Sequence, residues 1–319
     1  MTCAAPLYLA PIRGITDSVF RNAYAQCFTG IDSAVAPFVK TVNERLEPSQ
    51  LRDLLPDVNS AMKVVPQILT RNAAGFADGA ARLADLGYAE VNWNLGCPAP
   101  TTAGRGLGAG LLPNVDEIDA FLNTACRRIS IPISVKARLG YEHPDELFRL
   151  VPILNRYPLC RVIIHPRIAP QQYDGDVDVV RFSQCAAALR TKVVYNGDIT
   201  DVTGFNTIRS QFPDVSGWML GRGVIANPFL PARILSSAAD TGNSATDNAT
   251  LQQFHTLLYE GYRARFSGPR HVITRMYGIW TYLIHTLGLP PGALKHLKKA
   301  KNFSDYQSAV ASLLSKSMI

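Results

Sequence analysis

The sequence lacks the features that would direct it into or across a membrane. No apolar run approaches the roughly 18 residues that a membrane span needs. Residues 1–13 show no basic region and no cleavage site typical of a signal peptide. The six cysteines are scattered without a CxxC pair, which argues against a disulfide framework or a zinc site. We therefore expect a cytoplasmic protein with reduced thiols, no membrane contact and no metal.

Charge is also scarce, and it is unevenly distributed. Charged residues make up 18% of the 319-residue chain and hydrophobic residues 47%, which is ordinary for a globular protein. Residues 251–319 hold nine lysines or arginines against two acids, whereas residues 1–250 hold 23 basic and 23 acidic groups. The whole net charge of +7 thus lies in the last fifth of the chain. Such a field favours a polyanionic partner whose binding weakens steeply with salt.

Short apolar runs alternate with helix-like stretches along most of the chain. They lie at 6–11, 31–37, 64–69, 90–96, 132–138, 161–165, 192–196 and 217–221. Continuous apolar runs suit parallel strands buried on both faces. This periodicity fits a doubly wound sheet as well as a barrel. Because polar residues collect at the C-terminal ends of several strands, we predict the α/β class and a TIM (β/α)8 barrel.

The end of the chain differs in composition from the rest. Residues 236–249 are rich in turn formers and predict a linker between a barrel at 1–235 and a second domain at 250–319. Apolar positions at helical spacing follow over 251–266, 271–287 and 305–315. We expect a small all-α domain there.

A glycine-rich loop follows the fourth predicted strand and contains Cys97. Glycine permits positive φ and close approach of a ligand, and Pro98 fixes the direction of the turn just after the thiol. A lone cysteine is usually an inert core residue. The position at a strand end of a barrel favours a chemical role instead.

Basic residues lie in the C-terminal halves of the next two predicted strands. Lys136 and Arg138 alternate along 134–140, so both side chains lie on one face of a strand. They need a bound anion there, or else an ion pair with a neighbouring acid. His165 ends an apolar run and is either a core histidine or a ligand contact.

Two short glycine motifs follow the last two strands. Asn196-Gly197-Asp198 comes after the seventh strand, and Gly221-Arg222-Gly223 comes after the eighth. Loops at these two places in such barrels commonly bind phosphate through backbone N–H groups. The pair predicts a site of the kind that holds flavin mononucleotide (FMN).

Taken in order, these motifs resemble those of the tRNA-dihydrouridine synthases. Residues 9–17, followed by Phe20-Arg21, are similar to the family opening APMxGxTDxxFR, and Asn94-Leu-Gly-Cys-Pro98 is similar to NxGCP. The segments VKARLG at 135–140, NGDI at 196–199 and LGRG at 220–223 complete the ordered set. Residues 274–282 resemble part of the family's helical RNA-binding domain.

The resemblance implies an FMN barrel with an RNA-binding tail, in which NADPH or NADH reduces the flavin. Hydride then passes from flavin N5 to carbon 6 of a uridine in tRNA, and Cys97 gives a proton to carbon 5. The cofactor residues that it implies are Pro11, Ile12, Arg13, Gln67, Lys136, His165, Asn196, Gly197, Asp198, Gly221 and Arg222. The substrate residues that we expect are Asn94, Arg138 and Tyr173 for the uracil and Arg275, Lys295, Lys298, Lys299 and Lys301 for the tRNA. We expect a monomer.

The sequence departs from the family pattern at two places. Ile12 stands where methionine is usual, and Arg13 stands where a small or acidic residue is common. His165-Pro-Arg-Ile168 replaces the common HGRT, so we expect a stiffer turn without the threonine hydroxyl.

Two other functions fit parts of the pattern. A flavin-dependent small-molecule reductase related to dihydroorotate dehydrogenase would share the barrel and the phosphate site, but it leaves the basic tail unexplained. A noncatalytic RNA-binding protein on a degenerate barrel would explain the tail, but not the cysteine, lysine and flavin set.

Overall fold

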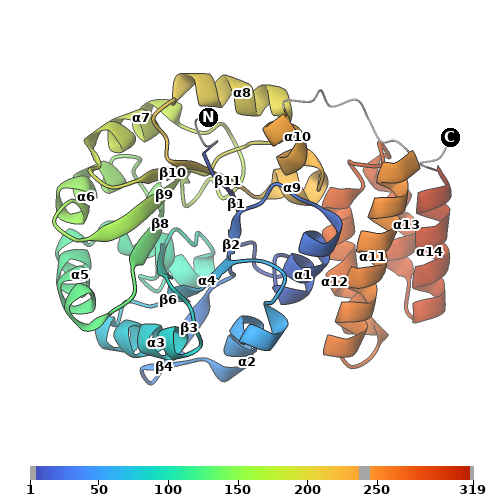
Figure 1. Cartoon of the computed structure of the whole chain (residues 1–319), viewed down its shortest axis with the longest axis horizontal. Helices are drawn as coiled ribbons and strands as arrows, with labels where there is room; N and C mark the ends of the chain where they lie inside the picture. Colours follow the sequence, from blue (N-terminus) through green and yellow to red (C-terminus); the bar gives the residue numbers. More distant parts are fainter. Residues whose placement is uncertain (1–4, 237–244, 317–319) are drawn as a thin grey trace.

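The computed structural model describes residues 5–236 and 245–316. A curled sheet lies inside a ring of helices, and a further group of helices stands against one side of this ring (Figure 1). The strands are β1 (Leu7–Leu9), β2 (Ser33–Val35), β3 (Val39–Val42), β4 (Arg45–Leu46), β5 (Val64–Val65), β6 (Gln67–Leu69), β7 (Val91–Leu95), β8 (Ile133–Gly140), β9 (Leu159–Ile168), β10 (Val193–Tyr195) and β11 (Gly217–Leu220). All eight predicted strands are present.

The sheet closes on itself at Pro66. β5 pairs with β2 and β6 pairs with β7, so the predicted strand 64–69 contacts both neighbours in turn. Pro66 separates the two halves, since proline has no N–H to donate to a ladder. β1 pairs in parallel with both β11 and β2, which completes the circuit. The prediction of a closed barrel is confirmed, and the doubly wound alternative is wrong.

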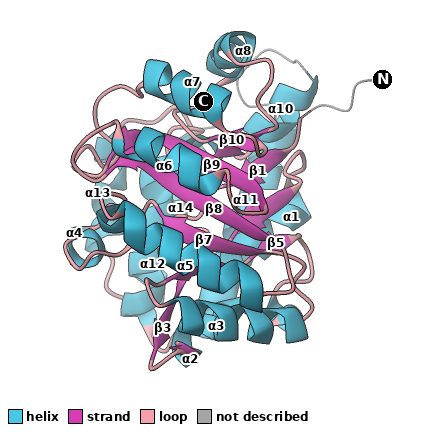
Figure 2. Ribbon diagram, turned by 90° about the vertical axis from the view of Figure 1, so that its left-hand side faces the viewer, coloured by secondary structure: helices cyan, strands magenta, loops and turns pink. Residues whose placement is uncertain are grey.

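Helices cover the outside of the barrel, and Figure 2 shows α3, α5 and α6 lying over β7–β9. Side chains of Asp17, Asn72, Asp178 and Asp201 each accept a hydrogen bond from the first turn of the helix that they precede, which fixes where these helices begin. The barrel helices are α1 (Ser18–Cys27), α2 (Pro48–Leu51), α3 (Ala73–Asp85), α4 (Pro100–Ala103), α5 (Val115–Arg128), α6 (Glu146–Leu154), α7 (Val179–Ala188), α8 (Val202–Gln211), α9 (Arg222–Ala226) and α10 (Leu230–Ser236).

Two features of the strands differ from the sequence prediction. β3 and β4 form an unpredicted hairpin, whose turn places Asn43 and Glu44 at φ 47° and 64°. Glutamate is not a usual residue for a positive-φ turn, so the sequence carries no hairpin signal here. β9 also continues to Ile168, so His165-Pro-Arg-Ile168 lies in a strand and the prediction of a turn there is wrong.

The C-terminal helices form two layers beside the barrel (Figure 1). They are α11 (Ala245–Arg265), α12 (Pro269–Leu283), α13 (Lys295–Lys299) and α14 (Phe303–Lys316), of which α13 was not predicted. α11 packs on α1 and α12 packs on α9, whereas α13 and α14 pack on each other. The predicted linker falls mostly on residues 237–244, outside the described residues, and the division into domains stays a prediction.

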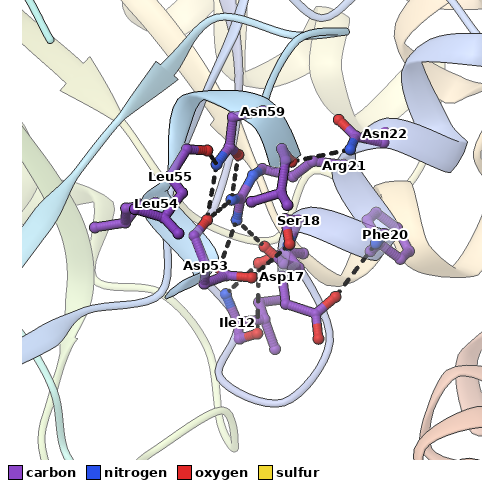
Figure 3. Close-up of polar contacts among 12 residues, drawn as sticks. Ile12, Asp17, Ser18, Phe20, Arg21, Asn22, Asp53, Leu54, Leu55 and Asn59 are labelled. Atoms are coloured by element: carbon purple, nitrogen blue, oxygen red, sulfur yellow. Dashed lines mark hydrogen bonds and ion pairs between the residues drawn. The ribbon is translucent and has the colours of Figure 1, made fainter. Parts of the chain in front are cut away.

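A buried polar cluster anchors the loop that joins β1 to α1. Arg21 is fully buried, and it donates to the Thr16 carbonyl at 2.8 Å and to the Asp53 carbonyl at 2.9 Å. Its Nη1 also lies 3.2 Å from Asp53 Oδ2, and its Nη2 donates to Asn59 at 2.6 Å (Figure 3). Asp53 in turn accepts from the Ser18 N–H at 2.7 Å. The loop therefore has little freedom to move away from the barrel.

The same cluster ties the barrel to the C-terminal helices. Arg265 of α11 donates to Asp53 Oδ1 at 3.0 Å, and Tyr262 donates to Asp17 Oδ1 at 2.9 Å. Arg265 and Arg275 lie 3.7 and 3.6 Å from Asp17 Oδ2. Residues that are more than 200 positions apart thus share one buried network, and this network sets where the helices sit beside the barrel mouth.

Candidate active site

Two adjoining hollows open at the C-terminal ends of the strands. They share Pro11, Lys136, His165 and Tyr173 as common walls. The cysteine hollow is further lined by Arg13, Phe38, Gln67, Asn94, Cys97 and Arg138. The loop hollow is further lined by Ile12, Asn196, Gly197, Asp198, Gly221 and Arg222. The structure therefore brings together every site residue that the sequence predicted within the barrel.

A chain of amide groups forms the floor of the cysteine hollow. Gln67 donates to Asn92 Oδ1 at 2.7 Å, and Asn94 donates to Gln67 Oε1 at 2.7 Å. Asn92 completes the chain by donating to Ser134 at 2.8 Å. Because these amides bind one another in sequence, their orientations are fixed. Asn92 was not among the predicted site residues, although it alternates with Asn94 along one strand.

Asn94 also shapes the turn that presents Cys97. Its Oδ1 accepts from the backbone N–H groups of Gly96 at 3.1 Å and Cys97 at 2.9 Å. The thiol is free and the residue is partly exposed. Gly108 folds back on this turn with φ 59°, and a Cβ there would lie 2.9 Å from the Cys97 Cβ. The turn thus requires glycine at 108 and holds the thiol at the wall of the hollow.

Lys136 and Arg138 lie on one face of β8, as the alternation predicts. Arg138 donates to the carbonyls of Gly96, Ile168 and Gln172 at 3.2, 3.0 and 2.5 Å. Within residues 5–236 and 245–316, neither cation has a carboxylate partner, so the predicted alternative of an ion pair is not found. Burial, with repulsion from Arg138, lowers the pKa of Lys136 to about 7. This lysine needs an anion to stay fully charged at neutral pH.

His165 is neutral in this setting. Burial, together with Arg138 and Lys136, holds its pKa well below the ordinary 6.5. Its Nε2 lies 3.2 Å from Nη1 of Arg167, which lies two residues further along the same face of β9. Arg167 was not among the predicted site residues, and the period-two alternation was the signal that could have found it.

Asp198 organises the wall of the loop hollow. Arg167 binds both of its carboxylate oxygens, with Nη1 at 3.0 Å from Oδ1, and Arg222 donates to Oδ1 at 2.7 Å. These two guanidinium groups hold the pKa of Asp198 below its usual value despite burial. Asp198 therefore fixes Arg222 in this wall and Arg167 in the lining of the neighbouring cavity.

Tyr173 stands between the hollows on the loop after β9. Its ring centre lies 5.7 Å from the Arg138 guanidinium and 4.8 Å from that of Arg222, which suits cation–π contact on both. Arg222 also donates to the Tyr173 carbonyl at 3.3 Å. The residue is 43% exposed, so part of its side chain remains open to a ligand.

A larger cavity of about 930 Å³ continues from the loop hollow towards α12. It shares Tyr173, Asp198 and Arg222 with the loop hollow, and Tyr282 and His285 line its far side. Residues of the barrel mouth and of the C-terminal helices therefore line one open cavity together.

The predicted RNA contacts of the tail do not line the two hollows. Arg275 sits between α12 and the barrel, with its guanidinium over the rings of Tyr262 and Phe266 at 5.6 and 5.5 Å. The lysine cluster, defined as Lys295, Lys298, Lys299 and Lys301, is exposed on α13 and just beyond its end. This cluster lies on the layer of helices farther from the barrel (Figure 1).

Two further properties bear on the chemistry of the site. Among the described residues, no three side chains of the metal-ligating types gather closely enough to hold a metal ion. None of the helices in this part of the chain is long and apolar enough to cross a membrane.

Comparison with known proteins gives consistent results. The model of the family described as dihydrouridine synthase (Dus) matches residues 8–283. A probable tRNA-dihydrouridine synthase of Rhodobacter capsulatus is 30% identical over 267 residues, 82% of this chain and 80% of that protein. The tRNA-dihydrouridine(16) synthase of Escherichia coli K12 is 27% identical over 70% of this chain and 73% of its own length.

Similar solved structures share only the barrel fold with this chain, because their sequence identities are low. Morphinone reductase superposes with a TM-score of 0.52 at 11% identity, over 76% of this chain and 88% of its own. A variant of NCR from Zymomonas mobilis gives 0.52 at 13% identity, over 76% and 90%. With the family match covering most of the chain and the motif residues gathered at one barrel mouth, the resemblance seen in the sequence is confirmed: this chain belongs to the dihydrouridine synthase family.

Proposed function

We propose that this enzyme is a tRNA-dihydrouridine synthase, which binds FMN and uses NADPH or NADH to reduce a uridine in tRNA to 5,6-dihydrouridine. The observation that carries the proposal is the pair of adjoining hollows, one lined by Cys97 and the other by Arg222, which Asp198 fixes. A cytoplasmic monomer would suit this role.

The residues of both hollows fit FMN. Lys136 and Gln67 would bind the ring, His165 the ribityl chain, and Pro11 and Ile12 would lie beside it. The phosphate would lie against Asn196, Gly197, Gly221 and Arg222; Asp198, whose carboxylate is ionised, would act at this end by orienting Arg222 and Arg167, which supply positive charge. FMN, when bound, supplies the hydride that reduces the base. The ammonium of Lys136, which lacks an acidic partner among the described residues, would stabilise negative charge on the ring.

Cys97 acts as the acid that protonates carbon 5 of the uracil. Its turn is fixed by the Asn94 side chain and by the close approach of Gly108, and these hold Cys97 at the wall of the hollow. A positioned acid lowers the barrier as the carbon becomes carbanion-like. Arg138 and Tyr173 flank the same hollow and would orient the base.

The target base must leave its stack to enter the hollow. The connected cavity of about 930 Å³ links the mouth to the C-terminal helices, which carry the concentrated positive charge. These helices, including Arg275 and the lysine cluster, would grip phosphates of the folded tRNA.

The test separates two half-reactions by stopped-flow absorbance of the flavin. The purified protein should be yellow, NADPH should bleach it, and unmodified tRNA should restore the colour. Cys97→Ala should keep FMN and its reduction but slow reoxidation by tRNA by a factor on the order of 10² to 10⁴. Cys126→Ala, which removes a partly buried thiol on α5, is the matched control and should behave as the parent.

Three results would contradict this proposal. Absence of any flavin spectrum after mixing with FMN would remove the enzymatic role. Reoxidation by a free pyrimidine but not by tRNA would favour a small-molecule reductase. Equal reoxidation rates in parent and Cys97→Ala would exclude Cys97 as the acid.

A further inference from the structure

Arg13 stands at the rim of the cysteine hollow. It lies in the turn after β1, its side chain is exposed, and it lines the hollow together with Phe38, Cys97 and Pro98. Its guanidinium lies 5.5 Å from the centre of the Phe38 ring, which is within cation–π range. The ring thus supports the guanidinium at the entrance.

The turn that carries Arg13 is rigid. The Ile12 N–H donates to Thr16 Oγ1 at 2.8 Å, and the Ile15 N–H donates to the Ile12 carbonyl at 3.0 Å. Gly14 adopts φ 83°, which the turn requires. Because Arg21 donates to the Thr16 carbonyl, the position of Arg13 is set by the buried network of α1.

Arg13 has donors to spare. In the described part of the chain it has no carboxylate partner, whereas nearby arginines are engaged: Arg138 by carbonyls, Arg222 by Asp198. A guanidinium carries five N–H donors, and with a flat supporting ring it is suited to bind phosphate oxygens in a fork. At the rim of the cysteine hollow, the Arg13 guanidinium is therefore placed to bind an anionic group of a ligand that enters from solvent.

We propose that Arg13 binds the RNA backbone, with its guanidinium on a phosphate next to the flipped uridine and Phe38 holding it flat. This inference rests on the proposed function. A flipped nucleotide puts its base into the pocket, so its flanking phosphates stay at the rim. Lys136 and Gln67, which would bind the flavin, lie deeper in the hollow than the exposed Arg13. In this proposal Arg13 contacts the tRNA substrate, whereas the sequence resemblance implies a contact with the cofactor.

The test compares Arg13→Ala, Arg13→Lys and Arg13→Glu with the parent holoenzyme. We expect Arg13→Ala to raise KM for tRNA about fivefold and to lower the slope of log Kd against log salt by roughly 0.9. Arg13→Glu should raise KM further, and Arg13→Lys should restore part of the affinity, since it keeps the charge but not the fork. The flavin spectrum, FMN Kd and rate of reduction by NADPH should not change. Arg127→Ala removes an exposed arginine on α5 and is the matched control.

Each other result would overturn the proposal in a recognisable way. A changed FMN Kd or flavin spectrum in Arg13→Ala would make the residue a cofactor contact. A raised KM for NADPH alone would make it a contact for the reductant. Unchanged KM and salt slope for tRNA would remove any RNA role. If the parent enzyme itself fails to transfer hydride to tRNA, the proposed function fails before any Arg13 variant is compared.

Discussion

Lys136 gives the proposed flavin site a pH dependence that can be worked out in advance. Burial and the neighbouring Arg138 lower its pKa to about 7 in the free protein. The lysine therefore loses its proton as pH rises through 7, while the anionic phosphate of FMN bound in the loop hollow, which Lys136 also lines, would raise its pKa again. Binding of FMN should weaken as the pH rises, because only the ammonium form attracts the ligand.

The size of the change in FMN affinity follows from the fraction of protein molecules in which Lys136 is protonated. With a pKa of about 7, the ammonium form falls from about half at pH 7 to about a tenth at pH 8 and about a hundredth at pH 9. The apparent Kd for FMN should thus rise about fivefold from pH 7 to 8 and then continue to rise towards the value of Lys136→Met by pH 9. His165 does not titrate in this window, since its pKa is depressed well below 6.5.

The assay is a titration of apoprotein with FMN by flavin fluorescence between pH 7 and 9. The phosphate of FMN is largely doubly ionised over this range. A Cys97→Ala background removes any contribution of the thiol, and riboflavin serves as a ligand without phosphate. Lys136→Met should weaken binding at pH 7 by about 2 kcal/mol, or roughly thirtyfold, and leave Kd independent of pH. Two results would refute the reasoning. One is a Kd for FMN that does not change with pH in the Cys97→Ala protein. The other is the same rise of Kd with pH after Lys136→Met is added.

Three further predictions concern stability and RNA binding. Asp53→Asn leaves the fully buried Arg21 without its counter-charge and should lower the free energy of unfolding in urea by about 3 to 5 kcal/mol. The exposed Asp57→Asn should cost less than about 0.5 kcal/mol, and equal values for the two variants would contradict the buried-pair account. Burial lowers the pKa of His255 to about 4, so the stability present above pH 6.5 should decline by about 2 kcal/mol between pH 7 and 5. In urea unfolding, His255→Gln should lose about 2 kcal/mol less than the parent over this range, because only the contribution of His165, whose pKa is also depressed, remains. Equal declines in the two proteins would be a refutation. Neutralising the whole lysine cluster should weaken tRNA binding and reduce its salt slope by up to roughly 0.9 for each phosphate that is no longer bound, with flavin reduction unchanged. An unaltered slope would move the RNA surface elsewhere.

Several parts of the site could be predicted from the sequence because they depend on local order. Most strands are rich in apolar residues, since a parallel strand in a barrel is buried on both faces. The residues after these strands had to meet, because parallel strands end on the same face. The alternation of Lys136 and Arg138 fixed their common side, and counting charges located the basic segment in the tail.

The tertiary structure alone decided which side chains became partners. Asp198 looked like part of a phosphate loop, yet it binds Arg167 from another strand, and Arg275 of the tail lies against Asp17. The lysine cluster is one of the most basic stretches of the chain, yet it lies on the outer helices. Closure of the sheet at Pro66 and the turn at Asn43 likewise depend on neighbours that are distant in sequence. Sequence patterns indicate the spacing of apolar residues and the buried face of each helix or strand. Ion pairs and the openings of the hollows form only where separate elements meet in space.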